Sequence, residues 1–365
     1  MRKMSSKISF TIEADLLNAL GQLVPGEKSP LSIFNVKDGK KPADKTQRLQ
    51  ATGLLDPSGK IRSEYSLVLD TLAKAMNVSS LKYTAGSKLF EFIVTFPNVK
   101  GTPSISALHD GNQVIIQSPA GVEDAFTLID QNVGHSKLSS SGFSGKFSPE
   151  EAMALLALMD LERAANLHAI ADGTAVKSTT FDLAEVAGKV AKCAKTLQSL
   201  EYALQAQLEL STQPTADPVG AGLKGLVDKK LVSLQNGNYQ LSDVASHFAG
   251  RLPIIDNFVS VEAGKFDGDG KLIYANFTAL QAGVNDILYF ENHDKEIVIK
   301  SVSGMELLGL VAKYLNEPDA IKLPIPTAAP TQPASGASKK FCRQCGAPLP
   351  PNSKYCETCG NKTLP

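Results

Sequence analysis

Apolar residues follow two different periods along this chain. Runs rich in β-branched and aromatic residues, such as Leu89–Phe96 and Leu272–Leu280, predict strands. Residues 182–209 instead carry an apolar side chain at every third or fourth position, which predicts one long helix. The residues of this stripe are Leu183, Val186, Val190, Cys193, Leu197, Leu200, Leu204 and Leu208. Such a stripe fits either docking on the rest of the chain or pairing with a partner helix.

The start of a further helix is marked by the residues around position 148. Ser148 precedes Pro149 and Glu151, so we expect the serine to cap the helix, the proline to take its first position and the glutamate to complete a capping box. Helical and strand patterns are thus mixed along the chain, which predicts the α+β class.

The body of the chain contains an internal repeat. A shift of 183 positions lays Leu89–Phe126 on Leu272–Gly309 without a gap, and the pattern S-x-x-G-x-E recurs at Ser118 and Ser301. Each copy is expected to hold helices, about three antiparallel strands and a closing helix. The sequence therefore predicts an internally duplicated body with antiparallel sheets.

The repeat divides this body into two α+β modules. The first covers residues 8–138, and the second covers residues 147–317 with the long helix 182–209 inserted. We expect similar faces of the two modules to pack about a pseudo-two-fold axis.

The composition changes after the second module. Residues 318–340 lack apolar periodicity and are rich in Ala, Thr, Ser and Gly. They also include Pro324, Pro326, Pro330 and Pro333. This composition predicts a semi-extended linker, which tethers a small C-terminal segment, residues 341–360, to the body.

Four cysteines stand in two C-x-x-C pairs within that segment. They are Cys342, Cys345, Cys356 and Cys359. One tight turn presents two sulfurs at this spacing, so two turns supply the closed tetrahedral shell of thiolates that structural Zn²⁺ prefers. We therefore predict that these four residues bind one structural zinc ion and leave no open position for catalysis. Disulfides or free thiols are the alternative.

The residues around the cysteines follow a pattern as well. Gly346 and Gly360 come directly after the two pairs, and Phe341 and Tyr355 come directly before them. These features resemble the short zinc-ribbon family found at the ends of many bacterial proteins. The resemblance covers about 20 residues and implies that the same four cysteines are the metal ligands. Zinc is expected to be needed for folding, because so short a segment buries too little core.

A second resemblance concerns the body. The pattern L-x-x-x-G-L-L-x-x-x-G-x-I runs from Leu49 to Ile61 and is followed by a predicted helix, strands and a closing helix. With these features, residues 8–316 resemble the EspG-type chaperones of type VII secretion. The resemblance implies a pseudo-two-fold α+β body that grips a helical secreted protein; the zinc ribbon is not part of that family's pattern.

Composition and charge narrow the classes of protein. The chain has 365 residues, 43% of them hydrophobic, which is ample for packed cores. Its 37 basic residues equal its 37 acidic residues, so no overall field favours nucleic acid or an anionic membrane. No apolar run approaches the roughly 18 residues that a membrane span requires. We expect no membrane insertion and a cytoplasmic location, where cysteine pairs stay available for metal.

Candidates for other chemistry lie in the body, but each has a simpler interpretation. His109–Asn112 and Asp267–Gly270 have the composition of turns. Ser118 and Ser301 are expected to cap helices, and Cys193 to be a small core residue. The five histidines show no metal-binding spacing, and the sequence has neither a Walker loop nor a dinucleotide fingerprint.

These observations favour a non-enzymatic, zinc-ribbon-containing binding or adaptor protein with a protein partner and a chaperone-like role. The first alternative is a transcription-associated protein that binds nucleic acid, because helix-turn-strand units such as Ala51–Ile61 occur in winged helices. Lys224, Lys229 and Lys230 form only a thin basic cluster in support of it. The second alternative is an enzyme with its site between the two modules. The sequence leaves the oligomeric state open.

Overall fold

The computed structural model describes two compact units, Met1–Pro324 and Ile325–Pro365, which we call the body and the C-terminal unit. The residues that it describes are 7–36, 44–85, 88–99, 101–139, 141–175, 179–207, 216–293, 296–316, 340–341 and 348–349. The boundary between the two units falls within the predicted linker, residues 318–340. In the C-terminal unit, the short strands β14 (Lys340–Phe341) and β15 (Pro348–Leu349) pair antiparallel.

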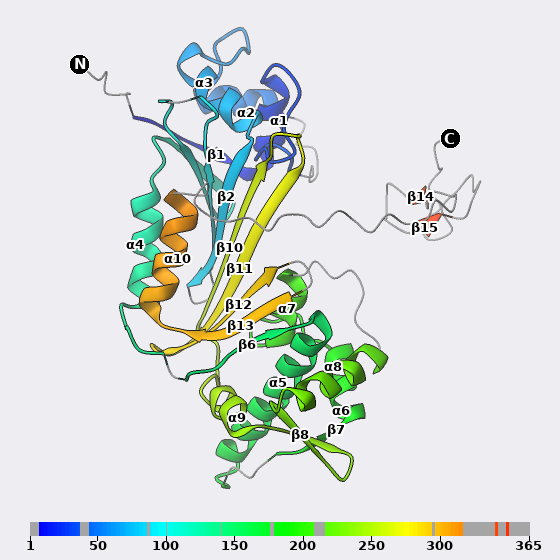
Figure 1. Cartoon of the computed structure of the whole chain (residues 1–365). Helices are drawn as coiled ribbons and strands as arrows, with labels where there is room; N and C mark the ends of the chain where they lie inside the picture. The colour runs from blue at the N-terminus through cyan, green and yellow to red at the C-terminus, as the bar shows by residue number, and fades with distance from the viewer. Residues whose placement is uncertain are drawn as a thin grey trace. The chain divides into compact units, whose positions relative to one another are not determined.

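One sheet of ten antiparallel strands forms the centre of the body (Figure 1). In spatial order its strands are β1 (Ile8–Glu13), β5 (Gln113–Ser118), β4 (Ile105–Asp110), β3 (Lys88–Thr95), β2 (Asn77–Ala85), β10 (Asn257–Phe266), β11 (Leu272–Ala282), β12 (Asp286–His293), β13 (Glu296–Val302) and β6 (Ser144–Phe147). Together with the helices described below, this sheet confirms the α+β class.

The order of strands is the same in the two halves when each is followed inward from its edge. The sequence β1-β5-β4-β3-β2 is matched by β6-β13-β12-β11-β10, and β2 pairs antiparallel with β10 at the centre. The shift of 183 positions carries β5 onto residues 296–301, which lie in β13. The predicted modules therefore share one continuous sheet, whereas descent from a duplication remains a prediction from the sequence.

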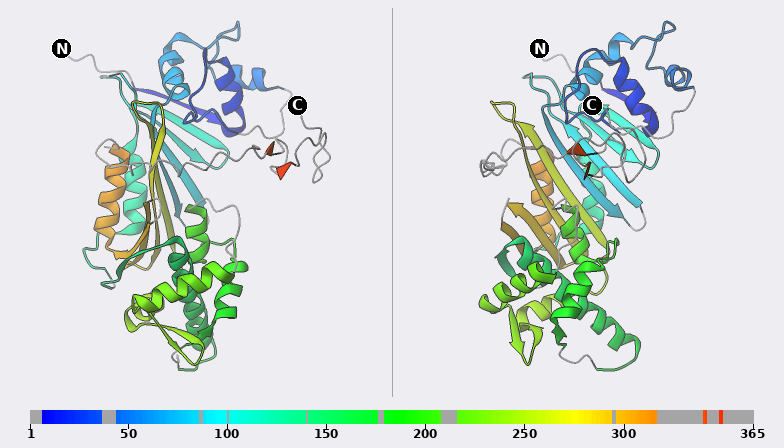
Figure 2. Two further views of the ribbon diagram at one scale, coloured as in Figure 1. Left: turned by 45° about the vertical axis from the view of Figure 1, so that its right-hand side comes forward. Right: turned by 90° about the vertical axis from the view of Figure 1, so that its right-hand side faces the viewer.

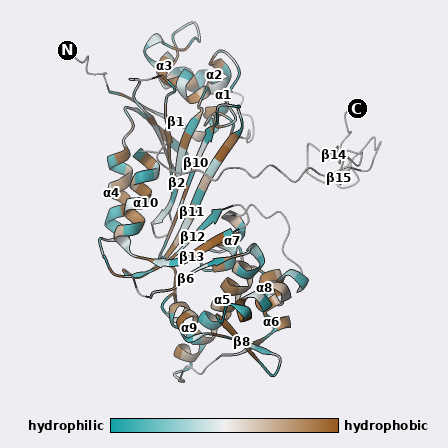
Figure 3. Cartoon of the chain, viewed as in Figure 1, coloured by the Kyte–Doolittle hydropathy of each residue, from teal (hydrophilic) through white to brown (hydrophobic). Residues whose placement is uncertain are grey.

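Two helices, α4 (Val122–Val133) and α10 (Gly304–Asn316), cover one face of the sheet (Figure 2). Polar and apolar residues form bands along both helices (Figure 3). The apolar side of α10 packs on aromatic residues of the sheet: the Tyr314 ring lies edge-on to that of Phe277, with 5.2 Å between centroids. The Ser79 hydroxyl also donates to the Tyr314 carbonyl at 2.7 Å, so β2 and α10 are joined by a polar contact within an apolar layer.

The opposite face of the sheet is covered by two helical lobes. The first lobe follows β1 and contains the 3-10 turn η1 (Ala14–Leu16) and the helices α1 (Leu17–Leu23), α2 (Lys45–Ala51) and α3 (Ser63–Ala73). Its apolar residues pack on β1, β4 and β5, with the Tyr65 ring edge-on to Phe10 at 5.3 Å.

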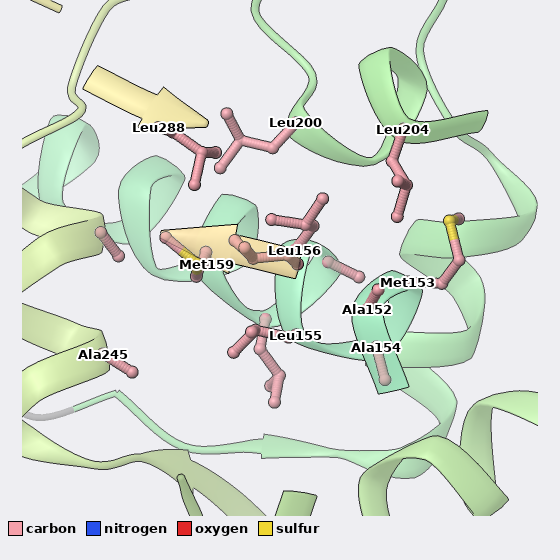
Figure 4. Packing of buried hydrophobic residues seen from close by; sticks show 14 of the residues in the cluster. Ala152, Met153, Ala154, Leu155, Leu156, Met159, Leu200, Leu204, Ala245 and Leu288 are labelled. Carbon is pink, nitrogen blue, oxygen red and sulfur yellow. The ribbon is translucent and has the colours of Figure 1, made fainter. Parts of the chain in front are cut away.

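The second lobe is built around α5 (Pro149–Ala171). Its other elements are β7 (Phe181–Asp182), α6 (Leu183–Ala191), α7 (Leu200–Gln207), α8 (Ala216–Asp228), β8 (Val232–Gln235), β9 (Asn238–Leu241) and α9 (Asp243–Gly250). Ser148 and Glu151 form the predicted capping box at the start of α5. All eight residues 152–159 are buried, so this part of α5 is enclosed all round the helix. Figure 4 shows several of them packed among apolar residues of neighbouring elements, such as Leu200, Leu204 and Leu288.

The prediction of one long helix over residues 182–209 is wrong. The chain forms α6 and α7 instead, because polar groups elsewhere in the lobe bind the segment between them. The buried Asp160 carboxylate accepts from the Leu200 backbone N–H at 3.0 Å, which supplies a partner for the N-terminus of α7. The Gln198 side chain makes two hydrogen bonds of 2.8 Å with the Ile255 backbone.

The apolar stripe of this segment nevertheless packs inside the lobe, as one of its two interpretations predicted. Its buried residues are Val186, Val190, Cys193, Leu200 and Leu204. Leu183, at the start of α6, and Leu197, in the break between α6 and α7, remain 40% and 39% exposed.

Candidate functional site

The four predicted zinc ligands, Cys342, Cys345, Cys356 and Cys359, all lie outside the described residues. One observation next to them bears on their fit to zinc. Phe341 pairs with Pro348, so the two ends of the segment that holds the first C-x-x-C pair are brought together. A tight turn that presents two sulfurs needs such a closure, and four thiolates are the donor set of a structural zinc site.

Elsewhere, the part of the chain that the structure describes holds no cluster of three or more His, Cys, Asp or Glu side chains suited to a metal. His135 Nε2 lies 2.7 Å from Asp130, and His293 Nε2 lies 3.4 Å from Glu291. The zinc prediction therefore rests on the four C-terminal cysteines. Cys193 is buried in the second lobe, as expected of a core residue.

The segments interpreted as turns are turns. His109 and Asp110 end β4, and Gly111, at a φ of +60°, and Asn112 form the turn that joins β4 to β5. The Asp267 carboxylate accepts from the backbone N–H groups of Asp269 and Lys271, at 3.0 and 2.9 Å. These bonds occupy one carboxylate oxygen within the turn itself.

The expectation that Ser118 and Ser301 cap helices is wrong. Ser118 ends β5, and α4 begins only after Gly121, with no side-chain cap. Ser301 lies within β13, and Ser303 caps α10 instead, where it exchanges hydrogen bonds with Glu306. Each helix begins further along the chain than the S-x-x-G-x-E pattern suggested.

The first lobe contains an apolar groove with a cavity volume of about 590 Å³, which we call the N-terminal groove. It lies between the end of α1, the turn before α3, and α3 itself. Its lining residues are Leu23, Val24, Pro25, Gly59, Lys60, Ile61, Ser66, Leu67, Leu69 and Asp70. Leu67 is 64% exposed and Leu23 is 41% exposed, whereas Leu69 is fully buried beneath them.

Hydrogen bonds hold the wall of the groove that precedes α3. The Asp56 carboxylate accepts from the backbone N–H groups of Ser58 at 2.8 Å and Lys60 at 3.0 Å. Hydrogen bonds from the Ser58 hydroxyl and the Lys60 backbone lower the pKa of Asp56, so this turn stays fixed at neutral pH. Gly59, at a φ of +82°, takes a conformation that suits glycine.

Charge is confined to the rim of the groove. Among the described residues, Lys60 and Asp70 are the two charged ones that line it, and Asp70 is paired with Lys74 at 2.6 Å. The groove therefore presents a fixed, mainly apolar surface with separate positive and negative positions. Such a surface suits the apolar side chains of a partner rather than proton transfer or metal binding.

The second lobe has the connectivity of a winged helix. Apart from α7, its order is α5, β7, α6, α8, β8 and β9, and the small sheet has the strand order β7-β9-β8. In DNA-binding members of the helix-turn-helix class, the helix equivalent to α8 enters the major groove.

The exposed side of α8 is unsuited to that role. It consists of Asp217, Ala221, Lys224 and Asp228, in which acidic residues outnumber the one basic residue. Lys229, just after the helix, is already bound to Glu151 and to the Lys146 carbonyl. Phosphate contacts require a basic surface, so this side of α8 disfavours DNA.

A cluster of buried charges joins α5, α6 and α7. Arg163 donates to Asp160, while Lys189 Nζ lies 2.9 Å from a Glu201 oxygen and 3.5 Å from an Asp160 oxygen. Burial, followed by the hydrogen bond and charge of Asp160, raises the pKa of Glu201 to about 8. Glu201 is fully buried and does not line the N-terminal groove. A second cavity, of about 360 Å³ and lined by residues that include Arg251 and Asp286, does not include Glu201 either.

This cluster is one that sequence reasoning missed. Its members come from three helices, and their spacing follows no binding pattern. Because the pKa of Glu201 depends on which residues surround it after folding, no signal in the sequence could have identified it.

None of the described helices is long and apolar enough to cross a membrane. No protein-family model matches the chain, and a search of curated proteins finds no match either. The resemblances to short zinc ribbons and to EspG-type chaperones therefore stay predictions from the sequence.

Proposed function

We propose that this chain is a non-enzymatic adaptor that binds a protein partner through the N-terminal groove and carries a zinc ribbon as a separate contact element. The observation that carries the proposal is the groove itself. Burying an exposed leucine side chain contributes about 1.5–3 kcal/mol, so Leu23 and Leu67 together supply a useful share of the energy of a complex.

An amphipathic helix is the partner element that best fits the groove. Such a helix places an apolar side chain every third or fourth position, and these would lie against Leu23 and Leu67. Charged residues beside its apolar stripe would meet Lys60 and Asp70 at the rim. A helical partner is also what the resemblance to EspG-type chaperones implies, which supports a chaperone-like role in the cytoplasm.

The zinc ribbon has a structural role in this proposal. Cys342, Cys345, Cys356 and Cys359 hold one Zn²⁺ and thereby fold residues 341–360. A shell of four thiolates gives the site a net charge of about −2, which reduces the basic excess of this segment. A protein contact is therefore favoured over nucleic acid for the ribbon too.

The proposal is tested by affinity capture from native cytosol with Leu67→Glu as the variant. Leu138→Glu is the matched control, because Leu138 is 69% exposed and lies outside the groove. We expect a reproducible partner to be lost with Leu67→Glu and kept with Leu138→Glu. If both variants keep the partner, the N-terminal groove is not the surface that binds it.

The role of the ribbon is tested in the same experiment by replacing all four C-terminal cysteines with serine. Metal analysis should show about one zinc per chain in the wild type and none in the variant. If the partner is lost together with the zinc, the ribbon is a recognition element. If the partner is kept, recognition lies in the body.

A transcription-associated role is the second candidate, and the winged-helix connectivity of the second lobe is the observation that favours it. Fluorescence anisotropy with labelled duplex DNA tests it directly. Binding that weakens with salt and with Lys224→Ala would support it, because each lost phosphate contact reduces the salt dependence by about one unit. If the chain does not bind the labelled DNA at low salt, the transcription-associated role is ruled out.

An enzyme with a site between the two halves is the third candidate. The two halves meet where β2 pairs with β10, along the register from Val259 opposite Tyr83 to Lys265 opposite Asn77. The carboxyl with the strongly raised pKa, Glu201, is enclosed in the second lobe rather than at this junction. The geometry therefore supports this candidate less than the adaptor.

A further inference from the structure

The two edge strands of the ten-stranded sheet differ in how well their outward-facing backbone groups are protected from pairing with another strand. An edge strand exposes backbone N–H and C=O groups that can pair with another strand. Proteins usually prevent this with short strands, charged side chains, proline or a covering element. The edges of this sheet are β1 and β6.

The register of β1 shows which of its backbone groups face outward. The Ala14 N–H donates to the Asn112 carbonyl at 2.8 Å, and the pairing continues through Ile12 opposite Val114. Because bonded positions alternate in an antiparallel pair, Ile8, Phe10 and Ile12 bond to β5. The backbone groups of Ser9, Thr11 and Glu13 therefore point to the free edge. No described residue forms a backbone hydrogen bond with these groups across that edge.

The outward-facing backbone groups of the other edge strand, β6, are protected. By the same alternation, the Ser301 N–H bonded to the Phe143 carbonyl leaves Ser144 and Lys146 facing outward in β6. The Lys146 carbonyl already accepts from Lys229 Nζ at 2.8 Å. The Lys146 side chain pairs with Glu296 at 2.7 Å, and α5 begins only two residues after β6 ends. This edge is short, charged and covered.

The side chains of β1 offer little that would block pairing, because its one charged residue, Glu13, stands at the end of the strand and is paired with Arg48 of α2. The strand has the sequence Ile-Ser-Phe-Thr-Ile-Glu, with no proline and no lysine. Phe10 and Ile12 are buried against the first lobe, whereas Ser9 and Thr11 are exposed on the other face. An incoming strand must likewise alternate between apolar and polar residues to match both faces.

The sequence of β1 itself meets this requirement. In an antiparallel pair of two β1 strands with Thr11 on the two-fold axis, Phe10 lies opposite Ile12 of the second copy and Ser9 lies opposite its Glu13. The outward-facing residues then form the bonded pairs, and three such pairs give about six hydrogen bonds. Apolar residues meet apolar residues, and polar residues meet polar residues.

We propose that a second copy of this chain occupies the free edge, so that two bodies join through antiparallel β1 strands into one continuous sheet. The proposal does not depend on the N-terminal groove or on zinc. It assigns β1 as a self-association surface and leaves the β6 edge outside the interface.

Sedimentation velocity of the full-length, zinc-loaded chain tests the proposal. We expect a dimer, and we expect Thr11→Lys to weaken it by at least about tenfold, because two lysines would face each other on the axis. Thr11→Pro should act in the same way, since the Thr11 N–H points outward and its loss breaks no bond to β5. Ser144→Lys, outward-facing on the other edge, should leave the dimer unchanged.

Disulfide formation gives a second and independent readout. Paired residues on the axis lie about 5.5 Å apart between Cα atoms, within the range that a disulfide spans. Thr11→Cys should therefore form a covalent dimer on mild oxidation, beyond the wild-type background, while Ser144→Cys should not. A monomer at concentrations on the order of 0.1 mM, or a dimer that survives Thr11→Lys, would overturn the proposal.

Discussion

The contact between α5 and α8 offers the sharpest test of the packing described above. Gly222 is buried in α8 against the start of α5. A Cβ atom at this position would lie 2.3 Å from the Glu150 carbonyl oxygen and 2.6 Å from its carbon. Both are backbone atoms, and the capping box of Ser148 and Glu151 holds this turn in place. The change Gly222→Ala must therefore displace one helix against the other.

The magnitude follows from two opposing effects. Ordinary Cβ contacts begin near 3.4 Å, so the two helices must separate by about 1 Å, and such overpacking costs about 1–3 kcal/mol. Because alanine has a higher helix propensity than glycine, the substitution also stabilises the helix by about 1 kcal/mol. We expect a net loss of up to about 2 kcal/mol in the free energy of unfolding.

Gly188→Ala in α6 is the matched control, because nothing lies within 4 Å of a Cβ at that position. It should stabilise the chain by about 0.5–1 kcal/mol through propensity alone. Urea unfolding of both full-length variants, followed by circular dichroism, measures the difference. If Gly222→Ala proved as stable as Gly188→Ala, the close approach of α5 and α8 would be refuted.

Three further predictions concern buried charge and zinc. Because the pKa of Glu201 is about 8 in the folded chain against an ordinary 4.5, the folded state binds the extra proton, and stability should fall as pH rises through this window. Glu201→Gln should make the free energy of unfolding, measured with urea at several pH values, depend less on pH. If this pH dependence were the same in the variant and the wild type, the raised pKa of Glu201 would be contradicted. Asp160→Ala should cost about 3–5 kcal/mol by the same assay, since it leaves the buried Arg163 without its carboxylate partner. Cys342→Ser should abolish zinc binding without shifting the unfolding midpoint of the body, and a shifted midpoint would show that the two units are coupled.

Local sequence determines where several elements begin and turn. The capping box at Ser148 and Glu151 starts α5 where predicted, because the partners of these side chains lie within the same turn of chain. Gly111 turns the chain from β4 to β5 for an equally local reason. The apolar runs around Leu89 and Leu272 became strands because their residue types favour a pleated, partly buried surface.

The zinc site belongs with these local features, although it stays a prediction. Its evidence is the spacing of four cysteines, and ligand spacing is read directly from the chain.

Contacts between residues far apart in the sequence decided the features of the fold that local sequence did not determine. The apolar period of residues 182–209 suggested one helix, but Ile255 and Asp160 bind the middle of that segment, at Gln198 and Leu200, and divide it into α6 and α7. The repeat predicted two modules, whereas only the pairing of β2 with β10 shows that they share one sheet.

The candidate sites follow the same division. The N-terminal groove needs α1 and α3 to meet, and the raised pKa of Glu201 needs three helices to exclude water around it. By itself the sequence determined the elements that close within a few residues, since both partners of each bond lie in one stretch of chain. Tertiary structure decided the single sheet, the broken helix, the groove and the open edge of β1, because each depends on which distant groups are brought together or left unpaired.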